Sequence, residues 1–154
     1  FKDGEESQIE SVNHNPENDS SEELVKAIHE SLKRSALPIL KNAIDNDRSK
    51  WEKDSSRKLA WELYARGLSQ RDIANQCEHK QAWVSKLLAE KSLSENIAQE
   101  AAMELIRRPE FQPIRKDPEG VDRMIEQLRN YLISSEQEET KPLLRQMINE
   151  VLNQ

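Results

Sequence analysis

The sequence predicts an all-α protein, and three observations support this fold class. Apolar residues recur at spacings of three and four along most of the 154 residues, and no segment alternates as a strand would. Only three glycines and six prolines are available for the turns of hairpins. Hydrophobic residues make up 35% of the chain and charged residues 34%, which suits amphipathic helices around a thin core. The expected fold is a helix-turn-helix domain with additional amphipathic helices and a disordered acidic N-terminal tail.

The chain opens with a strongly acidic segment. Residues 1–23 hold one lysine against eight acidic residues and few large apolar side chains. Such a segment cannot bury enough surface to offset the entropy of ordering. We therefore expect residues 1–20 to form a disordered acidic tail.

An N-terminal helix is expected over residues 21–50. Ser20 and Glu23 have the spacing of a capping box at its start. The apolar residues that follow share one helical face: Leu24, Val25, Ile28 and Leu32. Pro38 is expected to end or kink this helix, because proline lacks the N–H that the helix needs.

Residues 51–108 are predicted to form a helix-turn-helix DNA-binding domain. A first helix ends at Gly67, which suits the left-handed conformation that closes many helices. Ser69 then has a capping-box spacing with Asp72. Two short helical patterns follow, joined by the residues CEHK at 77–80. A further amphipathic helix has its apolar residues at Leu93, Ile97, Ala101 and Leu105.

The two short patterns meet the packing requirements of a DNA-binding helix-turn-helix. Ala74 supplies a small residue where the second helix crosses the first, and Val84, ten positions later, supplies the aliphatic corner. The second helix is expected over residues 80–91. Glu78 occupies the turn position where glycine is usual, and a non-glycine residue with positive φ is uncommon there. The expected inner-face residues are Ile73, Ala74, Cys77, Val84 and Leu87.

The outward face of the second helix is the predicted reading surface, because the major groove of DNA admits one α-helix. Gln81 can pair with adenine through two hydrogen bonds, and Lys86 can reach guanine or a phosphate. Trp83 has two interpretations: it packs against Leu87, or it stacks on the sugar-phosphate backbone. The predicted base-reading residues are Gln81, Ala82, Ser85 and Lys86. The predicted DNA-backbone contacts are Gln70, Arg71, Lys80, Arg57 and Lys58.

Charge asymmetry favours a nucleic-acid partner although the formal net charge is −6. Residues 24–92 hold fourteen basic and nine acidic residues, a net of +5, whereas residues 1–23 carry −7 and residues 93–154 carry −4. A basic centre between acidic arms is expected to bind double-stranded DNA with a steep dependence on salt.

Residues 117–154 are expected to form a C-terminal helical hairpin. Asp117 and Pro118 suit the N-cap and first position of its first helix. The residues EQEET at 136–140 are expected to break it from the last helix. The last helix carries a surplus of apolar residues, which predicts either a buried position or a partner-binding surface: Leu143, Leu144, Met147, Ile148, Val151 and Leu152.

Catalysis, cofactors and metal binding are not expected. One cysteine and three histidines cannot supply the roughly four ligands of a zinc site. Cys77 belongs to an inner helix face, where nothing lowers its pKa, and no glycine-rich phosphate loop is present. No apolar run approaches the roughly 20 residues of a membrane span, and no signal-peptide pattern is present. We expect a cytoplasmic, nucleoid-associated protein without membrane contact.

The stretch GLSQRDIANQCEHKQAWVSKLLAEKSL, residues 67–93, resembles the C-terminal helix-turn-helix of sigma-70-type RNA polymerase sigma factors, which recognises the promoter −35 element. The runs VSKLLAEKSLSENIAQEAAMELI and KDPEGVDRMIEQLRNYLISSEQEE are similar to divergent cyanobacterial-type sigma-like proteins, so the resemblance covers residues 57–139. It implies contact with core RNA polymerase through the β-subunit flap. Residues 77–79 depart from the family's Leu-Gly-aliphatic turn. The resemblance implies that Gln81, Ala82, Ser85 and Lys86 face bases and that Gln70, Arg71 and Lys80 hold phosphates.

The predicted function is sequence-specific DNA binding of sigma-70-like type in transcription initiation. Two alternatives stay open. One is a helical protein-interaction adaptor, favoured by the acidic total charge, by Glu78 and by the apolar last helix. The other is a partition-type or transposon-type DNA-binding protein that uses the same helix-turn-helix. Homodimerisation also stays open.

Overall fold

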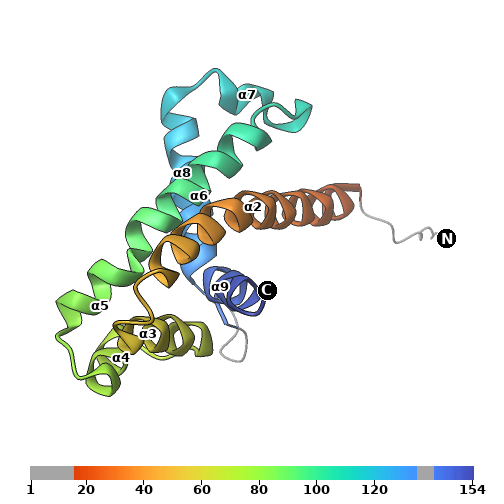
Figure 1. The fold of residues 1–154 in the computed structure, drawn as a ribbon. Coiled ribbons are helices and arrows are strands. Elements are labelled where there is room, and N and C mark those ends of the chain that lie inside the picture. Colours follow the sequence, from red (N-terminus) through yellow and green to blue (C-terminus); the bar gives the residue numbers. More distant parts are fainter. Residues whose placement is uncertain (1–15, 135–140) are drawn as a thin grey trace. The chain divides into compact units, whose positions relative to one another are not determined.

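The computed structural model describes residues 16–134 and 141–154, with side chains described from residue 22 (Figure 1), and every element in these ranges is helical. The predicted all-α fold class is confirmed. The elements are α2 (Pro16–Arg48), α3 (Ser55–Arg66), α4 (Gln70–Cys77), α5 (Gln81–Leu88), α6 (Glu90–Leu105), η1 (Pro109–Phe111), α7 (Gln112–Arg115), α8 (Pro118–Ile133) and α9 (Leu143–Leu152).

The N-terminal helix α2 starts earlier than the sequence predicts. Helix α2 begins at Pro16, four residues before the capping box expected at Ser20. The rest of the predicted acidic tail, residues 1–15, lies outside the described residues, and so does the break expected at 136–140. The chain separates into two compact units whose boundary falls inside α2, between Glu30 and Ser31. The candidate site lies wholly in the second unit.

Pro38 does not end α2, which continues to Arg48. A proline inside a helix costs about 3 kcal/mol because one backbone hydrogen bond is lost and the ring clashes with the preceding turn. One face of α2 in the second unit is fully buried, and burying each large aliphatic side chain contributes about 1.5–3 kcal/mol. Packing therefore outweighs the local penalty. The buried residues are Leu32, Ala36, Leu40 and Ile44.

Helices α3, α4 and α5 pack against one another and lie within residues 51–108, where the sequence predicts a DNA-binding domain. Asp54 caps α3 by accepting a hydrogen bond from the backbone N–H of Ser56 at 3.2 Å. Gly67 ends α3 with φ at 108°, the left-handed conformation that the sequence predicts. In Figure 1 α3 and α4 lie side by side, as their contacts require.

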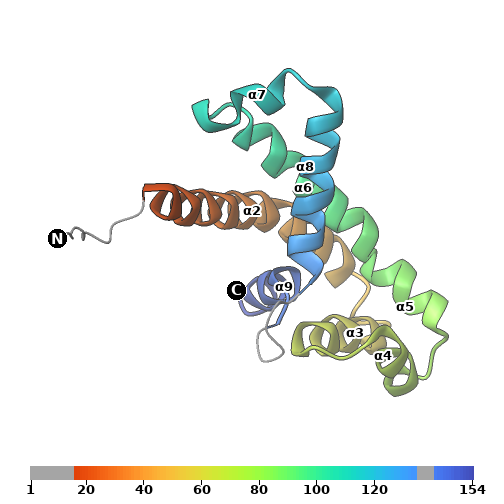
Figure 2. The same ribbon diagram turned by 180° about the vertical axis from the view of Figure 1, so that it is seen from behind.

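The two C-terminal helices pack against different parts of the protein, α8 against α6 and α9 against α3. Helix α8 packs along α6, and α9 packs against both α3 and α8 (Figure 2). The apolar face of α9 is buried at Leu143, Leu144, Met147, Ile148 and Val151. The surplus of apolar residues on the last helix therefore supports α3 in addition to α8. Among the helices described, none is both long enough and apolar enough to cross a bilayer.

Candidate nucleic-acid interface

The corner between α4 and α5 is built on the predicted inner-face residues. The Ser69 hydroxyl caps α4 by accepting a hydrogen bond from the backbone N–H of Asp72 at 3.1 Å. Leu87, expected on the inner face, is half-buried, and Leu88 is buried beside it. The corner is therefore held by apolar contacts on one side of each helix. The remaining buried residues are Ile73, Ala74, Cys77 and Val84.

The turn between α4 and α5 places a glutamate in the left-handed conformation. Glu78 has φ at 58° and ψ at 41°. The N–H of Glu78 donates to the carbonyl of Asn75 at 3.3 Å, and the N–H of His79 donates to that of Ala74 at 2.9 Å. These bonds satisfy carbonyls at the end of α4, so the turn has the backbone geometry that usually takes glycine.

Trp83 stacks on His79, with ring centroids 3.7 Å apart and planes inclined by 10°. The sequence analysis did not predict this contact, and the two predicted roles of Trp83, packing against Leu87 and stacking on the sugar-phosphate backbone, stay predictions. The stack joins the turn to the first turn of α5 and stabilises their relative position.

Helix α5 is shorter than the sequence predicts. It ends at Leu88, whereas residues 80–91 were expected to form one helix. Ala89 adopts the left-handed conformation with φ at 47°, donates its N–H to the carbonyl of Ser85 at 2.9 Å, and precedes the first residue of α6. No glycine marks this position, so the sequence carries no local signal for the break.

The predicted base-reading face of α5 is exposed. Arg71 and Lys80, predicted to contact phosphates, are exposed as well. Gln70 is half-buried and lines one cavity of about 420 Å³ together with Ser85, so the start of α4 lies beside the reading face of α5. The charged residues that line the same cavity are Glu90, Lys91 and Glu95. The exposed residues of the reading face are Gln81, Ala82, Ser85 and Lys86.

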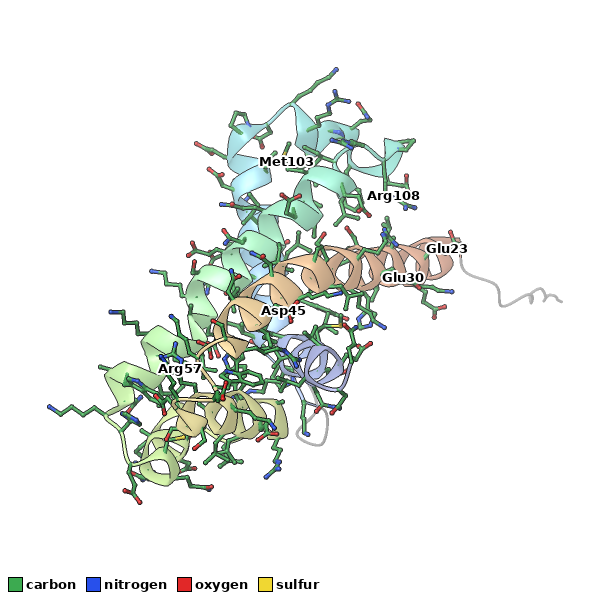
Figure 3. All side chains as sticks on the ribbon, in the orientation of Figure 1. Glu23, Glu30, Asp45, Arg57, Met103 and Arg108 are labelled. Atoms are coloured by element: carbon green, nitrogen blue, oxygen red, sulfur yellow. The ribbon has the colours of Figure 1, made fainter. Side chains whose placement is uncertain are left out.

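Arg57, predicted to contact the DNA backbone, is paired with a carboxylate of α2. Arg57 extends from the start of α3 (Figure 3). Its guanidinium donates from Nε and Nη2 to Oδ1 of Asp47, at 2.8 and 2.6 Å. The indole N–H groups of Trp51 and Trp61 donate to Oδ2 of the same carboxylate, at 2.8 and 3.0 Å. Arg57 is thus used to join α2 to α3.

Asp47 is the centre of this cluster and is only 8% exposed. Burial alone would raise the pKa of its carboxyl. The hydrogen bonds from Arg57, Trp51 and Trp61, with the positive charge of Arg57, outweigh burial and hold the pKa below its ordinary value. The carboxylate therefore stays charged and fixes the start of α3 against the end of α2.

Lys58 is exposed but lies at a different site from α5. It lines a cavity of about 330 Å³ with residues from the end of α2, from α3 and from α9, among them Arg48, Trp51, Arg66 and Asn149. The structure thus brings together Gln70 and the α5 face but not the two predicted contacts on α3.

Arg145 of α9 holds the end of α3 and was missed by the sequence analysis. Its Nη1 donates to the carbonyls of Tyr64 and Leu68, at 2.7 and 2.8 Å, and its guanidinium lies 4.0 Å from the centroid of the Tyr64 ring. The Tyr64 hydroxyl donates to Glu90 at the start of α6. Burial and this bond to Glu90 raise the pKa of Tyr64 above its ordinary value. One contact chain therefore links α9 and α3 to the α5–α6 junction.

Cys77 is a core residue, as the sequence predicts. Its side chain is buried, and its sulfur lies 3.6 Å from the carbonyl oxygen of Ser56, to which the thiol donates. Burial, together with the negative charge of Asp54, raises the pKa of the thiol. Within residues 16–134 and 141–154, no group of three or more histidine, cysteine, aspartate or glutamate side chains is placed to hold a metal ion.

No protein-family model, curated protein or solved structure matches this chain. The resemblance to sigma-70-type factors therefore stays a prediction from residues 57–139.

Proposed function

We propose that the α4–α5 pair is a DNA-binding helix-turn-helix and that the protein is a sequence-specific DNA-binding protein of sigma-70-like type. The observation that carries the proposal is the division of α5 into two faces. Val84 and Leu88 are buried in the corner, whereas Gln81, Ser85 and Lys86 are exposed. A helix held in this way can present one row of polar side chains to base edges.

The dimensions of α5 suit the major groove. Its eight residues span about 12 Å, and the groove is about 12 Å wide, so the helix can enter along its length. Arg71 in the first turn of α4 and Lys80 at the N-cap of α5 stand where phosphates would flank the groove. Gln81 occupies the first residue of α5, the end from which recognition helices contact bases.

The sigma-like part of the proposal depends on the sequence resemblance. That resemblance supports recognition of a −35-like promoter element and contact with core RNA polymerase during transcription initiation. We assign the chain no catalytic activity of its own and a location on the nucleoid. A pull-down with core polymerase tests this part separately, and loss of the polymerase contact would leave a partition-type or transposon-type DNA-binding protein.

The test of DNA binding compares three alanine variants on sites selected from random DNA. Gln81→Ala should relax the preference at one base pair, a loss of about 1–3 kcal/mol in discrimination. Arg71→Ala should weaken binding to all sequences about equally and lower the salt slope by about one unit. Lys58→Ala removes an exposed cation away from α5 and should change neither quantity.

Three results would contradict the proposal. The first is that wild-type protein fails to shift DNA at low salt. The second is that Gln81→Ala and Arg71→Ala lose affinity equally on specific and random sites. The third is that Lys58→Ala weakens binding as much as Arg71→Ala does.

A second candidate function is a helical protein-interaction adaptor that keeps the α4–α5 pair only as architecture. Glu90 and Glu95 favour it, since the cavity beside Gln70 and Ser85 has these two carboxylates against one cation, Lys91, and a net negative charge opposes a phosphate there. An electrophoretic shift on random DNA separates the two candidates, because an adaptor has no affinity for any duplex.

A further inference from the structure

A groove of about 830 Å³ lies between α2 and α6 within residues 31–154. The hydroxyl of Ser31 donates to the carbonyl of Ala101 at 3.4 Å, and Arg34 pairs with Glu104, so the two helices are tied together along the groove. Apolar side chains from both helices line it, among them Ile39 of α2. The groove is separate from the α5 reading face, since none of the predicted base-reading residues lines it.

Met103 of α6 lines this groove and is 53% exposed. Its neighbours on α6, Ala101, Ala102 and Leu105, are buried, and α6 packs on α8. Among the described side chains, few large hydrophobic ones are exposed to this degree. The groove around Met103 has both apolar and charged residues, among them Ile39, Glu100 and Arg107. An exposed methionine in such a groove suits a surface that another amphipathic helix covers.

The charges around Met103 have a self-complementary order. Glu100, Met103, Glu104 and Arg107 follow one another at positions i, i+3, i+4 and i+7, so they form one stripe along α6 and the turn after it. Glu104 is already paired with Arg34, whose hydrogen bond is the main cause that holds the pKa of Glu104 below its ordinary value. Glu100 and Arg107 are exposed at the two ends of the stripe, and no ion pair joins either to a described residue.

We propose that the groove binds a second copy of this chain, with the α6 helices antiparallel across a two-fold axis. An axis between Met103 and Glu104 brings Glu100 of each copy opposite Arg107 of the other, because both residues lie equally far from it in sequence. Met103 of each copy then lies opposite Glu104 of the other copy, at the mouth of its groove. Because each contact of a two-fold interface occurs twice, the stripe gives two ion pairs between Glu100 and Arg107 and two buried copies of Met103.

The charge order selects a second copy over an unrelated helix. The positive charge of Arg107 also acts on Glu104, whose pKa it helps to lower. A stripe with a negative residue at one end and a positive residue at the other complements itself when it is reversed. An unrelated partner would need the same order of charges by coincidence. This inference does not depend on DNA binding, so it can succeed or fail independently of the proposed function.

The test is a charge exchange followed by light scattering or sedimentation equilibrium over a range of protein concentrations. Wild type should form a dimer. Glu100→Arg alone and Arg107→Glu alone should each be monomeric, because each sets like charges opposite each other. An equimolar mixture of the two single variants should recover a heterodimer, since one copy then has two arginines and the other two glutamates at these positions. The double variant within one chain should also recover the dimer.

Two further variants complete the experiment. Met103→Glu should abolish the dimer at every concentration, with helical content by circular dichroism unchanged because the side chain faces solvent. Glu52→Arg makes the same charge change at an exposed residue outside the groove and should dimerise as wild type does. A monomeric wild type overturns the proposal. So does a dimer that survives the single charge changes, and so does a mixture of the two single variants that stays monomeric.

Discussion

Replacing Asp47 by asparagine tests how the α3–α5 segment is held against α2. The carboxylate accepts four hydrogen bonds, two from Arg57 on Oδ1 and one each from Trp51 and Trp61 on Oδ2. Asparagine has one oxygen and one NH₂ group. Whichever way the amide is turned, its NH₂ group faces N–H donors, so one pair of hydrogen bonds is lost together with the charge.

The expected loss of stability follows from the burial of the cluster. Breaking a buried ion pair by removing one partner costs about 3–5 kcal/mol. The side chain of Arg57 is 21% exposed and can regain some hydration, so we expect the low end, about 3 kcal/mol. For a domain of this size, such a change lowers the melting temperature by roughly 10 °C. Because folded domains have about 5–15 kcal/mol of stability, the variant should still fold.

Urea unfolding followed by tryptophan fluorescence measures this loss, because Trp51 and Trp61 both contact the carboxylate. Asp45→Asn is the matched control. Asp45 is 50% exposed and pairs with Arg48 at 3.3 Å, and exposed pairs contribute about 0–1 kcal/mol. A loss for Asp47→Asn no larger than that of the control would refute the structural role of the cluster.

The difference in the free energy of unfolding between wild type and Asp47→Asn also depends on pH, and the direction follows from the lowered pKa of Asp47. The folded state holds the pKa of Asp47 below the ordinary value of 3.8, so folding is stabilised where the carboxyl is charged in both states. This contribution is fully present above pH 3.8 and is lost as the pH falls through the folded pKa. The free-energy difference between wild type and Asp47→Asn should therefore shrink in acid. A difference that grows in acid would contradict this assignment.

Two further substitutions test the turn and the contact from α9. Glu78→Gly should raise the free energy of unfolding by up to about 1 kcal/mol, because glycine adopts the left-handed conformation without strain. A urea titration measures this change, and a destabilised variant would contradict the turn geometry. Arg145→Ala should lower the free energy of unfolding by about 2 kcal/mol, because its hydrogen bonds to two backbone carbonyls are lost. Hydrogen exchange at Leu68 and in α4 should increase. Unchanged exchange there would show that α9 does not hold the end of α3.

Predictions from the sequence succeeded where the physical cause is local. Gly67 and Ser69 lie at the ends of helices because the conformation of one residue and one side-chain bond decide them. The inner and outer faces of α5 also followed from spacing alone. The break at Ala89 did not, because an alanine with positive φ has no signature in the sequence and depends on the packing around it.

The contacts that the sequence analysis missed are between residues distant in the chain. Asp47 follows Leu40 and Ile44 on the buried face of α2, so an acidic residue on an apolar stripe was a visible signal. Its partner Arg57 lies ten positions later on another helix, and Arg145 lies 81 positions from Tyr64. Helical periodicity describes one helix at a time and cannot predict which charged residues of two helices meet.

The position of Arg57 changes what DNA binding should look like. Five of the residues predicted to contact DNA are cations: Arg57, Lys58, Arg71, Lys80 and Lys86. The structure places Arg57 against Asp47 and Lys58 beside α9, which leaves three of these five near α5: Arg71, Lys80 and Lys86. Each phosphate contact contributes about −0.9 to the slope of log K against log salt, so three contacts give a slope of about −3 and five give about −4.5. Fluorescence anisotropy across a salt series measures this slope, and a value near −4.5 would show that cations outside the α4–α5 pair also contact DNA.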